Sequence, residues 1–342
     1  MPTIDPAQLE AKATRIFTAM GTPDGDAAWI AALLVRANLR GHDSHGVIRI
    51  PQYWESVKKK EVDPRSPVTV TAETPALARL DGGGGFGQVV GRRAMEMAIA
   101  KAKAGGLSAA STSRTSHVGR LADYAEMAAN AGLVGMLWAN CVHGLNVAPW
   151  GGAARRLGTN PHAVGIPGAG GPAMVLDFAT SVVAEGKMRV KKNRKQQAPP
   201  GWFIDAEGKP GTDPEVFYGT PPGSLLTAGE HKGYGMSLAV ELLGGILSGT
   251  GAASPGTGVF ANGTLMICLD VERFIPLTEF RKQVATFFAW VKTAPRVPGG
   301  GEILIPGEPE ARLEAERRRD GIPIEGETWR QIETLAAEVG VG

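Results

Sequence analysis

The spacing of apolar residues changes along this chain, from a helical repeat near the start to short apolar runs in the middle. The segment DAAWIAALLVRANLRG, residues 26–41, repeats apolar residues at helical spacing, and YWESVKKKE after Pro51 continues that pattern. From about Val68 onward, apolar runs separated by glycines predict strands, and longer amphipathic stretches between them predict helices. Strands that alternate with helices predict an α/β fold.

The order of the predicted elements along the chain predicts how it divides into domains. Because helical ends flank an α/β middle, we predict two domains: a discontinuous helical domain of residues 1–72 with about 285–342, and an α/β domain of residues 73–284. The predicted strands lie in 68–81 (two strands), 107–113, 133–140, 173–181 and 264–271, and the predicted helices lie in 87–106, 117–133, 185–195, 231–250, 277–294 and 309–321.

The composition narrows the class of protein. The chain has 342 residues, of which 43% are apolar and 20% charged, a profile typical of a soluble protein with a substantial core. The net charge is +2, and the basic runs at 58–60, 189–195 and 317–319 are interpreted as solvated faces, so a nucleic-acid partner is not expected.

Cysteine content and hydropathy indicate the compartment. The chain has two cysteines, Cys141 and Cys268, which is too few for a disulfide framework or a four-cysteine zinc site. The N-terminus MPTIDPAQLE shows no basic leader with an apolar stretch, and no run reaches about eighteen apolar residues. We therefore expect a cytoplasmic protein without a membrane partner.

The segment GHDSHGVIRIPQY, Gly41 to Tyr53, carries the most informative chemistry. If it is helical, His45 and Arg49 are four residues apart and share a face. Imidazole exchanges a proton near neutral pH, and a guanidinium group binds a carboxylate with two hydrogen bonds. This pair suits chemistry on a 2-oxo or 2-hydroxy acid, although a solvated helix edge capped by Asp43 or Ser44 is the structural alternative.

A glycine run, GGGGFG at Gly82 to Gly87, formally satisfies the G-x-G-x-x-G pattern of dinucleotide-binding loops between a strand and a helix. The acidic residue that should end the next strand is missing, because LSAASTSRTSH has Ser113 and Arg114 there. We therefore favour a flexible turn. A two-domain dehydrogenase that binds pyrophosphate on these glycines remains the alternative.

Several other loops carry hydrogen-bond donors close to helix starts. His117 and Arg120 precede one predicted helix, and GEHKGYG at 229–235 sets His231 and Lys232 among glycines before another. Loops of this kind suit phosphate groups. His42 lies three residues before His45, but no carboxylate or cysteine complement accompanies the pair, so no metal site is predicted.

The order of these motifs resembles a known family. RGHDSHGVIRIPQY, TSHVGRLADYA, VAPWGG, LGTNP, LDFATSVVAEGKM, GWFIDAEGKPGTDP and GEHKGYGMSLAVELLGGILSG together are similar to the second type of malate/L-lactate dehydrogenases, whose relatives include ureidoglycolate, sulfolactate and 2,3-diketogulonate oxidoreductases and cyclic-imine carboxylate reductases. The resemblance extends from about Arg40 to about Ile322. It implies an NAD- or NADP-dependent oxidoreductase that transfers a hydride between nicotinamide and a small 2-hydroxy or 2-oxo acid such as malate or lactate. A reductase of cyclic-imine 2-carboxylates, or a ureidoglycolate-type dehydrogenase, is the alternative within the same family.

The family also implies a fold and an assembly. Its members have an α/β fold with a mixed sheet plus a helical domain, which is not the common Rossmann arrangement, and they form homodimers with the active site near the junction of domains and subunits. On this basis the α/β part of the chain binds NAD or NADP, and the helical part contributes to the substrate and dimer contacts. Arg114 and Arg120 favour the extra phosphate of NADP, whereas Ser113 is compatible with either cofactor.

For catalysis, the resemblance implies Ser44, His45 and Arg49, with His117 as a second candidate. A histidine would move the hydroxyl proton, with His45 preferred and His117 the alternative, while Arg49 holds the carboxylate and Ser44 orients the histidine or the substrate. A non-catalytic metabolite-binding or scaffold relative is the competing hypothesis, and the retention of these side chains argues against it. The implied cofactor contacts are His117, Val118, Gly119, Arg120, Leu121, Asn160, Asp177, Phe178, Ala179, Gly229, Glu230, His231, Lys232, Gly307 and Arg312.

Overall fold

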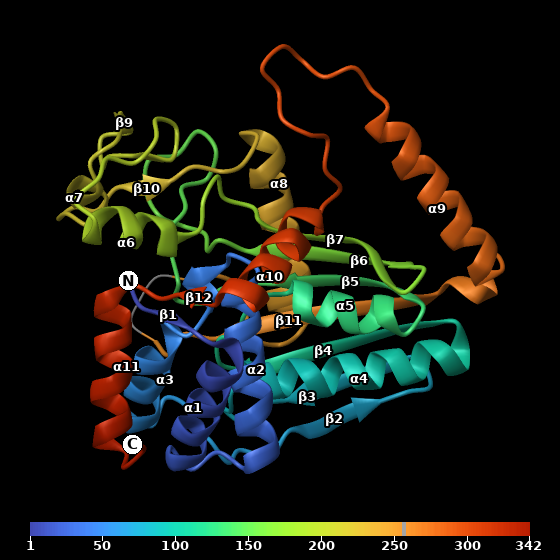
Figure 1. Ribbon diagram of the computed structural model, residues 1–342, viewed down its shortest axis with the longest axis horizontal. Helices are drawn as coiled ribbons and strands as arrows, with labels where there is room; N and C mark the ends of the chain where they lie inside the picture. Colours follow the sequence, from blue (N-terminus) through green and yellow to red (C-terminus); the bar gives the residue numbers. More distant parts are fainter. Residues whose placement is uncertain (255–257) are drawn as a thin grey trace.

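A seven-stranded sheet forms the centre of the molecule (Figure 1) in the computed structural model, which describes residues 1–254 and 258–342. The strand order is β2-β3-β4-β11-β5-β6-β7; β3 and β4 run parallel, and the other neighbouring pairs are antiparallel. The predicted α/β class with a mixed sheet is confirmed. The strands are β2 (Thr69–Glu73), β3 (Leu77–Asp81), β4 (Leu107–Thr115), β5 (Leu133–Ala139), β6 (Pro161–Gly168), β7 (Gly171–Ala179) and β11 (Asn262–Asp270).

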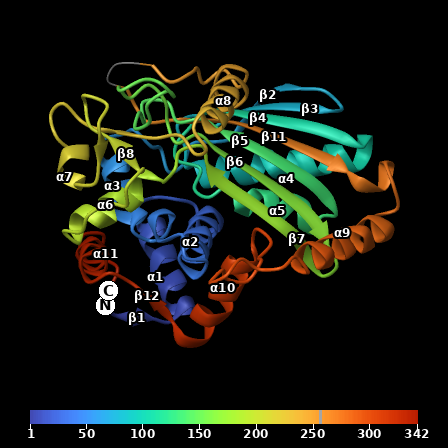
Figure 2. The ribbon, with the colours of Figure 1, turned by 90° about the horizontal axis from the view of Figure 1, so that it is seen from above.

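Helices α4 (Gly87–Gly105) and α5 (Ala122–Asn130) pack along one face of this sheet (Figure 2). Their sheet-facing positions are largely alanines, which lets the helix axes approach the strands closely. In β5 the residues facing this core alternate with half-buried ones, as expected for a strand with one fully covered face. Helix α8 (His231–Val240) and the π-helical turn η2 (Glu241–Ile246) contact β5, β6 and β11.

The two ends of the chain meet in a helical unit. Strand β1 (Thr3–Ile4) pairs with β12 (Ile322–Pro323), and an apolar cluster joins the helices of both ends. Figures 1 and 2 both show α11 beside the N-terminal helices, next to the two termini. The helices are α1 (Pro6–Ala19), α2 (Asp24–Leu39), α3 (Arg49–Lys58), α10 (Glu308–Asp320) and α11 (Gly326–Glu338).

A third, smaller cluster lies within residues 147–225, where Phe203, Phe217 and Leu225 are completely buried. The division at residues 72/73 and 284/285 stays a prediction, and the three apolar clusters group the chain more finely than it does. The elements of this region are α6 (Glu185–Asn193), β8 (Phe203–Ile204), β9 (Pro210–Gly211), α7 (Pro214–Phe217) and β10 (Ser224–Leu225).

Helix α9 (Leu277–Lys292) follows the short η3 (Val271–Arg273) and, like α10, has no fully buried residue. It contacts β6 and β7 and extends to one side of the molecule (Figure 1). The long connection after it returns to the sheet, where the Val175 N–H donates to the carbonyl of Pro306. This helix therefore leaves an apolar outer surface uncovered within the single chain.

All predicted strands and helices of the middle region are present, but the short elements β8, β9, α7 and β10 were not predicted, and three longer elements differ from the prediction. Strand β6 was not predicted, because prolines and glycines are rare in central strands; here Pro161 begins the strand and Pro167 lies at a register shift. Helix α5 begins at Ala122 rather than at His117. The predicted helix 231–250 changes from α-helical to π-helical geometry at Glu241.

Candidate active site

The turn that carries His45 is a break between two helices. Residues Asp43–His45 form the 3-10 turn η1 after α2, Gly46 is extended, and α3 begins at Arg49. A Cβ at Gly46 would lie 2.1 Å from the Asn38 side-chain oxygen, so the chain passes too close to α2 for any larger residue. The premise that His45 and Arg49 share one helix face is therefore wrong. Arg49 instead reaches back, and its Nε–H donates to the Ser44 carbonyl at 2.7 Å.

The tertiary fold places His117, which follows β4, beside His45. The two imidazole rings are stacked with centroids 5.6 Å apart and an interplanar angle of 29°. The Tyr53 hydroxyl lies 2.7 Å from His117 Nδ1, and the Ser44 hydroxyl lies 3.1 Å from His45 Nδ1. Both predicted acid/base candidates thus belong to one cluster, although 72 positions separate them in the sequence.

Glycine at position 87 makes this approach possible. A Cβ on Gly87 would lie 2.3 Å from the carbonyl oxygen of His117, a distance that backbone atoms do not tolerate. The last glycine of GGGGFG therefore lets α4 start directly against the His117 backbone.

The other glycines of the run form a tight turn whose backbone donors are occupied. The N–H groups of Gly82 and Gly84 donate to the carbonyls of Ser113 and Arg114, and that of Gly83 donates to the Asp81 carboxylate. A pyrophosphate cradle needs free N–H groups directed at the ligand. This geometry supports the turn interpretation of the run.

Burial makes both histidines poor proton binders. It lowers the pKa of His45 to about 3, and the positive charge of Arg49 acts in the same direction. Burial also lowers the pKa of His117 well below its usual value, again assisted by Arg49. Since an imidazole with a low pKa is neutral at pH 7, each ring has one nitrogen without a proton.

Arg49 is the uncompensated charge of this cluster. Its Nη1 donates to the Gln52 side chain at 2.7 Å, and among residues 1–254 and 258–342 no carboxylate forms an ion pair with it. Burial lowers its pKa, which shows that the cation is held in an environment that disfavours charge. A half-buried guanidinium without a carboxylate partner is suited to bind the carboxylate of a ligand.

The first turn of α6 closes one side of the cluster. A Cβ on Gly186 would lie 2.7 Å from the Ser44 Cβ, so α6 packs directly on the turn η1. Glu185 beside it is bound by the Tyr218 hydroxyl at 2.6 Å and by Arg189. The site therefore lies where the helical unit, the sheet and the third apolar cluster meet.

Residues 118–121, predicted to contact the cofactor, are built into the core next to His117. The Val118 N–H donates to the Asn262 side chain at 3.0 Å, and Leu121 is buried. Gly119 has a positive φ of 78°. Arg120 is buried and paired with Asp123 at 2.7 Å, so its guanidinium is already engaged by the protein.

Asn160 is completely buried, and its polar atoms bind the protein. Its side-chain oxygen accepts the Cys141 N–H, and its nitrogen donates to Ser237 and to Glu241, the latter at 2.7 Å. Glu241 also accepts from Asn140, whose carbonyl accepts from Asn262. This network connects the loop beside His117 to η2.

The remaining predicted cofactor contacts lie on three separate elements. Asp177 on β7 accepts the Ala122 N–H at 2.7 Å, and its neighbours are the exposed Phe178 and the half-buried Ala179. Gly307, with a φ of 98°, caps α10, and Arg312 on the surface of that helix pairs with Glu302. The exposed residues Gly229, Glu230, His231 and Lys232 form the start of α8.

Three side chains of the cluster were missed by the sequence reasoning as site members. Tyr53 ends the segment Gly41–Tyr53 but was given no catalytic or binding role in the site; on α3 it lies four residues after Arg49, a spacing that could have revealed it. Gln88 donates to the Tyr53 oxygen, and the Phe260 ring lies 6.2 Å from that of His117. No local pattern distinguishes these two residues, since only the fold brings them here.

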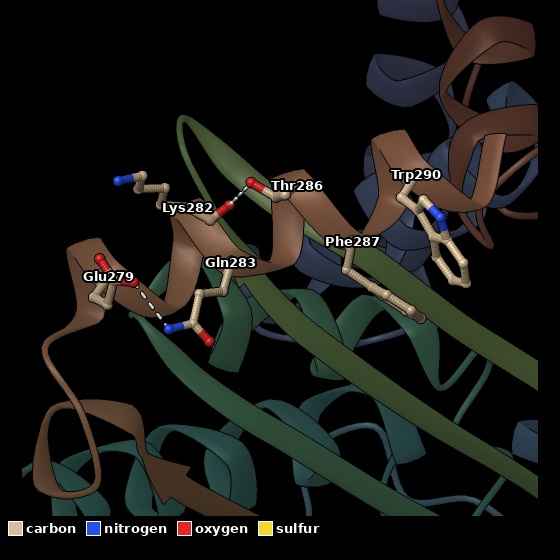
Figure 3. Close-up of a pocket in the computed structure, with 6 residues that line it drawn as sticks. All are labelled: Glu279, Lys282, Gln283, Thr286, Phe287 and Trp290. Carbon is tan, nitrogen blue, oxygen red and sulfur yellow. Dashed lines mark hydrogen bonds between the residues drawn. The ribbon is translucent and has the colours of Figure 1, made fainter. Parts of the chain in front are cut away.

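The hollow shown in Figure 3 lies elsewhere, on the outer surface of α9. Phe287 and Trp290 are 55% and 69% exposed there, and polar side chains of the same helix complete the lining. Within the described part of the chain, no set of three or more His, Cys, Asp or Glu side chains is arranged to hold a metal ion. None of the described helices combines the length and apolar character needed to cross a membrane.

Comparison with known proteins gives a consistent result over almost the whole chain. The family described as malate/L-lactate dehydrogenase matches residues 4–333. Hydroxycarboxylate dehydrogenase B of Escherichia coli K12 is 36% identical over 330 residues, covering 95% of this chain and 91% of the relative.

Solved structures agree with the sequence comparison. Sulfolactate dehydrogenase from Methanocaldococcus jannaschii superimposes with a TM-score of 0.91 at 34% identity, covering 100% of this chain and 98% of the other. The Δ1-piperideine-2-carboxylate reductase from Pseudomonas syringae gives a TM-score of 0.84 at 28% identity, covering 98% and 100%.

Proposed function

We infer the reaction from one premise, which is that this chain belongs to the malate/L-lactate dehydrogenase family. It is therefore a dehydrogenase. We propose that it oxidises a small 2-hydroxy acid, or reduces the corresponding 2-oxo acid, at the pair His45 and His117, with NAD or NADP as the cofactor. The observation that carries this proposal is the half-buried Arg49, a cation that has no carboxylate partner within residues 1–254 and 258–342 and lies beside two neutral imidazoles.

The side chains have separate roles in this scheme. The substrate carboxylate binds the free guanidinium edge of Arg49, which orients C2 toward the two rings. In the oxidation direction, the C2 hydrogen leaves as a hydride and the hydroxyl proton passes to an imidazole nitrogen. Because burial keeps both imidazoles neutral at neutral pH, each ring has one nitrogen that carries a proton and one that does not. Ser44 orients the His45 ring through its hydroxyl.

The start of α8 fits the phosphates of a dinucleotide. His231 and Lys232 are exposed there, and the backbone of Gly229 and Glu230 turns with positive φ values of 61° and 57°. A helix start with cationic side chains and such a turn favours anions. The bound nicotinamide supplies or accepts the hydride. Because the N–H donors of the glycine run are occupied, we propose a binding mode different from that of the Rossmann fold.

A cyclic-imine 2-carboxylate is the second candidate substrate. The Δ1-piperideine-2-carboxylate reductase from Pseudomonas syringae, which reduces such a compound, has the same fold over its full length. Arg49 would bind the carboxylate of either substrate, so the difference between them lies at the C2 substituent. Turnover measured with both 2-oxo acids and cyclic-imine carboxylates distinguishes the two.

We also propose a cytoplasmic homodimer. Several apolar side chains on α9 and around η2 are uncovered in the single chain: Trp290 (Figure 3), Leu242 and Leu247 are each more than half exposed. Exposed apolar surface of this extent is typical of subunit contacts. Both cysteines are free thiols, as in a reducing compartment.

The decisive experiment measures NADH and NADPH oxidation with a panel of 2-oxo acids and cyclic-imine carboxylates, followed at the nicotinamide absorbance. Turnover with at least one 2-oxo acid is expected, and it should fall strongly in His45→Ala and in His117→Ala. The matched control is His162→Gln, since His162 lies on β6 against Trp138. If neither cofactor is oxidised with any member of the panel, the proposed substrate class is wrong.

A further inference from the structure

A buried hydrogen-bond chain connects α4 to His117 through α3. Gln88 on α4 donates from Nε2 to the Tyr53 oxygen at 2.7 Å, and that oxygen lies 2.7 Å from His117 Nδ1. Gln88 is completely buried and Tyr53 is 5% exposed, so bulk water does not compete for these bonds. The rings of Phe17 and Phe86 pack against Tyr53 and hold its orientation.

The direction of this chain follows from its donors. Tyrosine has one hydroxyl proton, and because the Gln88 amide occupies one acceptor site of the Tyr53 oxygen, that proton is available to His117 Nδ1, 2.7 Å away. In this orientation the Gln88 amide has one unpartnered buried atom, its Oε1. The opposite orientation would bury the amide N–H groups without an acceptor. Unpaired buried N–H groups are rarer than unpaired carbonyl oxygens, so the orientation in which Gln88 Nε2 donates to Tyr53 is the favourable one.

The surroundings of His117 keep the ring neutral. The titratable groups that face it are Arg49 and Tyr53 on α3 and His45 at the end of η1. Arg49 and burial oppose a positive charge on the ring, and Tyr53 stays protonated because burial raises its pKa to about 12. A neutral imidazole whose Nδ1 accepts a hydrogen bond has its single proton on Nε2.

We propose that Gln88 and Tyr53 are positioning residues that fix His117 as the Nε2–H tautomer, so that His117 donates a hydrogen bond to the substrate oxygen and His45 accepts the proton. The substrate roles rest on the proposed function, whereas the tautomer does not. In the oxidation, the hydroxyl O–H bond breaks and its proton passes to the free nitrogen of His45, while the hydride leaves C2. His117 keeps its proton throughout, so His45 and not His117 is the base.

The tautomer is measurable in the substrate-free protein. Long-range ¹H–¹⁵N correlation spectra of protein labelled with ¹⁵N-histidine distinguish a protonated ring nitrogen from a bare one, and the spectrum of His117→Gln identifies the His117 signals. We expect a bare Nδ1 and a protonated Nε2 for His117. In Tyr53→Phe this fixed pattern should be lost. A proton on Nδ1 in the wild-type protein would overturn the proposal.

Turnover of paired variants tests the separate roles of His117 as donor and His45 as base. His117→Gln retains an N–H donor and should keep at least tenfold more turnover than His117→Leu, whereas His45→Gln and His45→Leu should be equally impaired, because glutamine does not accept a proton. Equal impairment of both His117 variants would refute the donor role. Bare Nδ1 without turnover on any 2-hydroxy acid would support the tautomer but overturn the substrate roles.

The pH profile separates positioning from simple stabilisation. In Tyr53→Phe the bare Nδ1 loses its donor and protonates more readily, so the acid limb of kcat/KM should move up by about one pH unit, with kcat about tenfold lower and KM little changed. Tyr124→Phe is the matched control, because it removes another buried hydroxyl, which donates to the Val118 carbonyl at 2.6 Å. An identical acid limb in Tyr53→Phe and wild type would contradict the positioning role.

Discussion

Two groups of charged residues in this protein differ in whether their arginines are paired with carboxylates. In the ion-pair cluster where α2, α5 and α10 meet, each of three arginines forms an ion pair with a carboxylate. Arg36 pairs with Glu126 at 2.8 Å, and Arg120 pairs with Asp123 at 2.7 Å. Arg40 pairs with Glu126 and, at 2.6 Å, with Glu314. In the histidine cluster, Arg49 binds a backbone carbonyl and an amide instead.

The difference shows how to separate a structural arginine from a functional one. In a buried ion pair, the attraction between the two charges offsets part of the free-energy cost of desolvating them, and the pair fixes how its two elements pack. An unmatched cation remains costly until a ligand supplies the negative charge. Burial with pairing therefore indicates structure, and burial without pairing indicates a binding site.

Breaking the ion-pair cluster should have the largest effect. Asp123→Ala leaves Arg120 in a buried position without its closest carboxylate, and we expect a loss of about 3–5 kcal/mol in the free energy of unfolding. Equilibrium denaturation with urea measures this. In the control pair Asp123→Leu with Arg120→Met, most of the stability should return, because no charge is left unpaired. A loss below about 1 kcal/mol in Asp123→Ala would contradict the structural role.

Removing Arg49 should affect activity and leave the fold intact. Arg49→Ala is expected to lower kcat/KM by a factor that corresponds to about 2–5 kcal/mol, because the substrate carboxylate loses its charged partner. The free energy of unfolding should be unchanged or higher, since a desolvated cation is removed. Arg49→Lys, which retains the charge but not the two-pronged geometry, should lie between. If Arg49→Ala unfolds as easily as Asp123→Ala, the comparison fails.

Asp177 is the carboxylate counterpart of Arg49, and it should make stability depend on pH. Burial raises its pKa to about 6, although the Ala122 N–H and Arg120 act against that rise. As the pH rises from about 4 to about 6, the unfolded carboxyl ionises while the folded one keeps its proton, so stability falls and then stays level.

Asp177→Asn should remove this dependence, because asparagine still accepts the Ala122 N–H but does not ionise. We expect the variant to be more stable than wild type by about 1–2 kcal/mol at pH 8 and equal to it at pH 4. Thermal unfolding at both pH values measures the difference. A gain of equal size at both pH values would point to packing instead of titration.

The smallest effect on stability is expected at the surface. Arg312 pairs with Glu302 in full contact with solvent, so Arg312→Ala should leave the melting temperature unchanged. If Arg312 contacts the cofactor as the family resemblance implies, the same variant should weaken dinucleotide binding, which fluorescence titration with NADH and NADPH measures. Unchanged affinity for both would remove Arg312 from the cofactor site.

Local sequence patterns predicted most of the elements correctly because those elements depend on local properties. The strand 133–140 and the helix 87–106 carry their periodicity within a few turns of chain, and both are present. Strand β6 was missed because its prolines and glycines weaken the strand signal, and only pairing with β5 and β7 stabilises it. The bend at Gly46 was missed because its cause is the Asn38 side chain on another helix.

The sequence by itself determined the family, the α/β class, and the residue types of the site, because motif order and periodicity are properties of the chain alone. Only the tertiary structure decided that His45 and His117 stack, that Tyr53 and Gln88 lie behind His117, and that Arg49 has no carboxylate partner in the described part of the chain. The physical reason is that pKa values, tautomers and unpaired charges depend on burial and on neighbours distant in sequence. These quantities exist only once the three apolar clusters have packed.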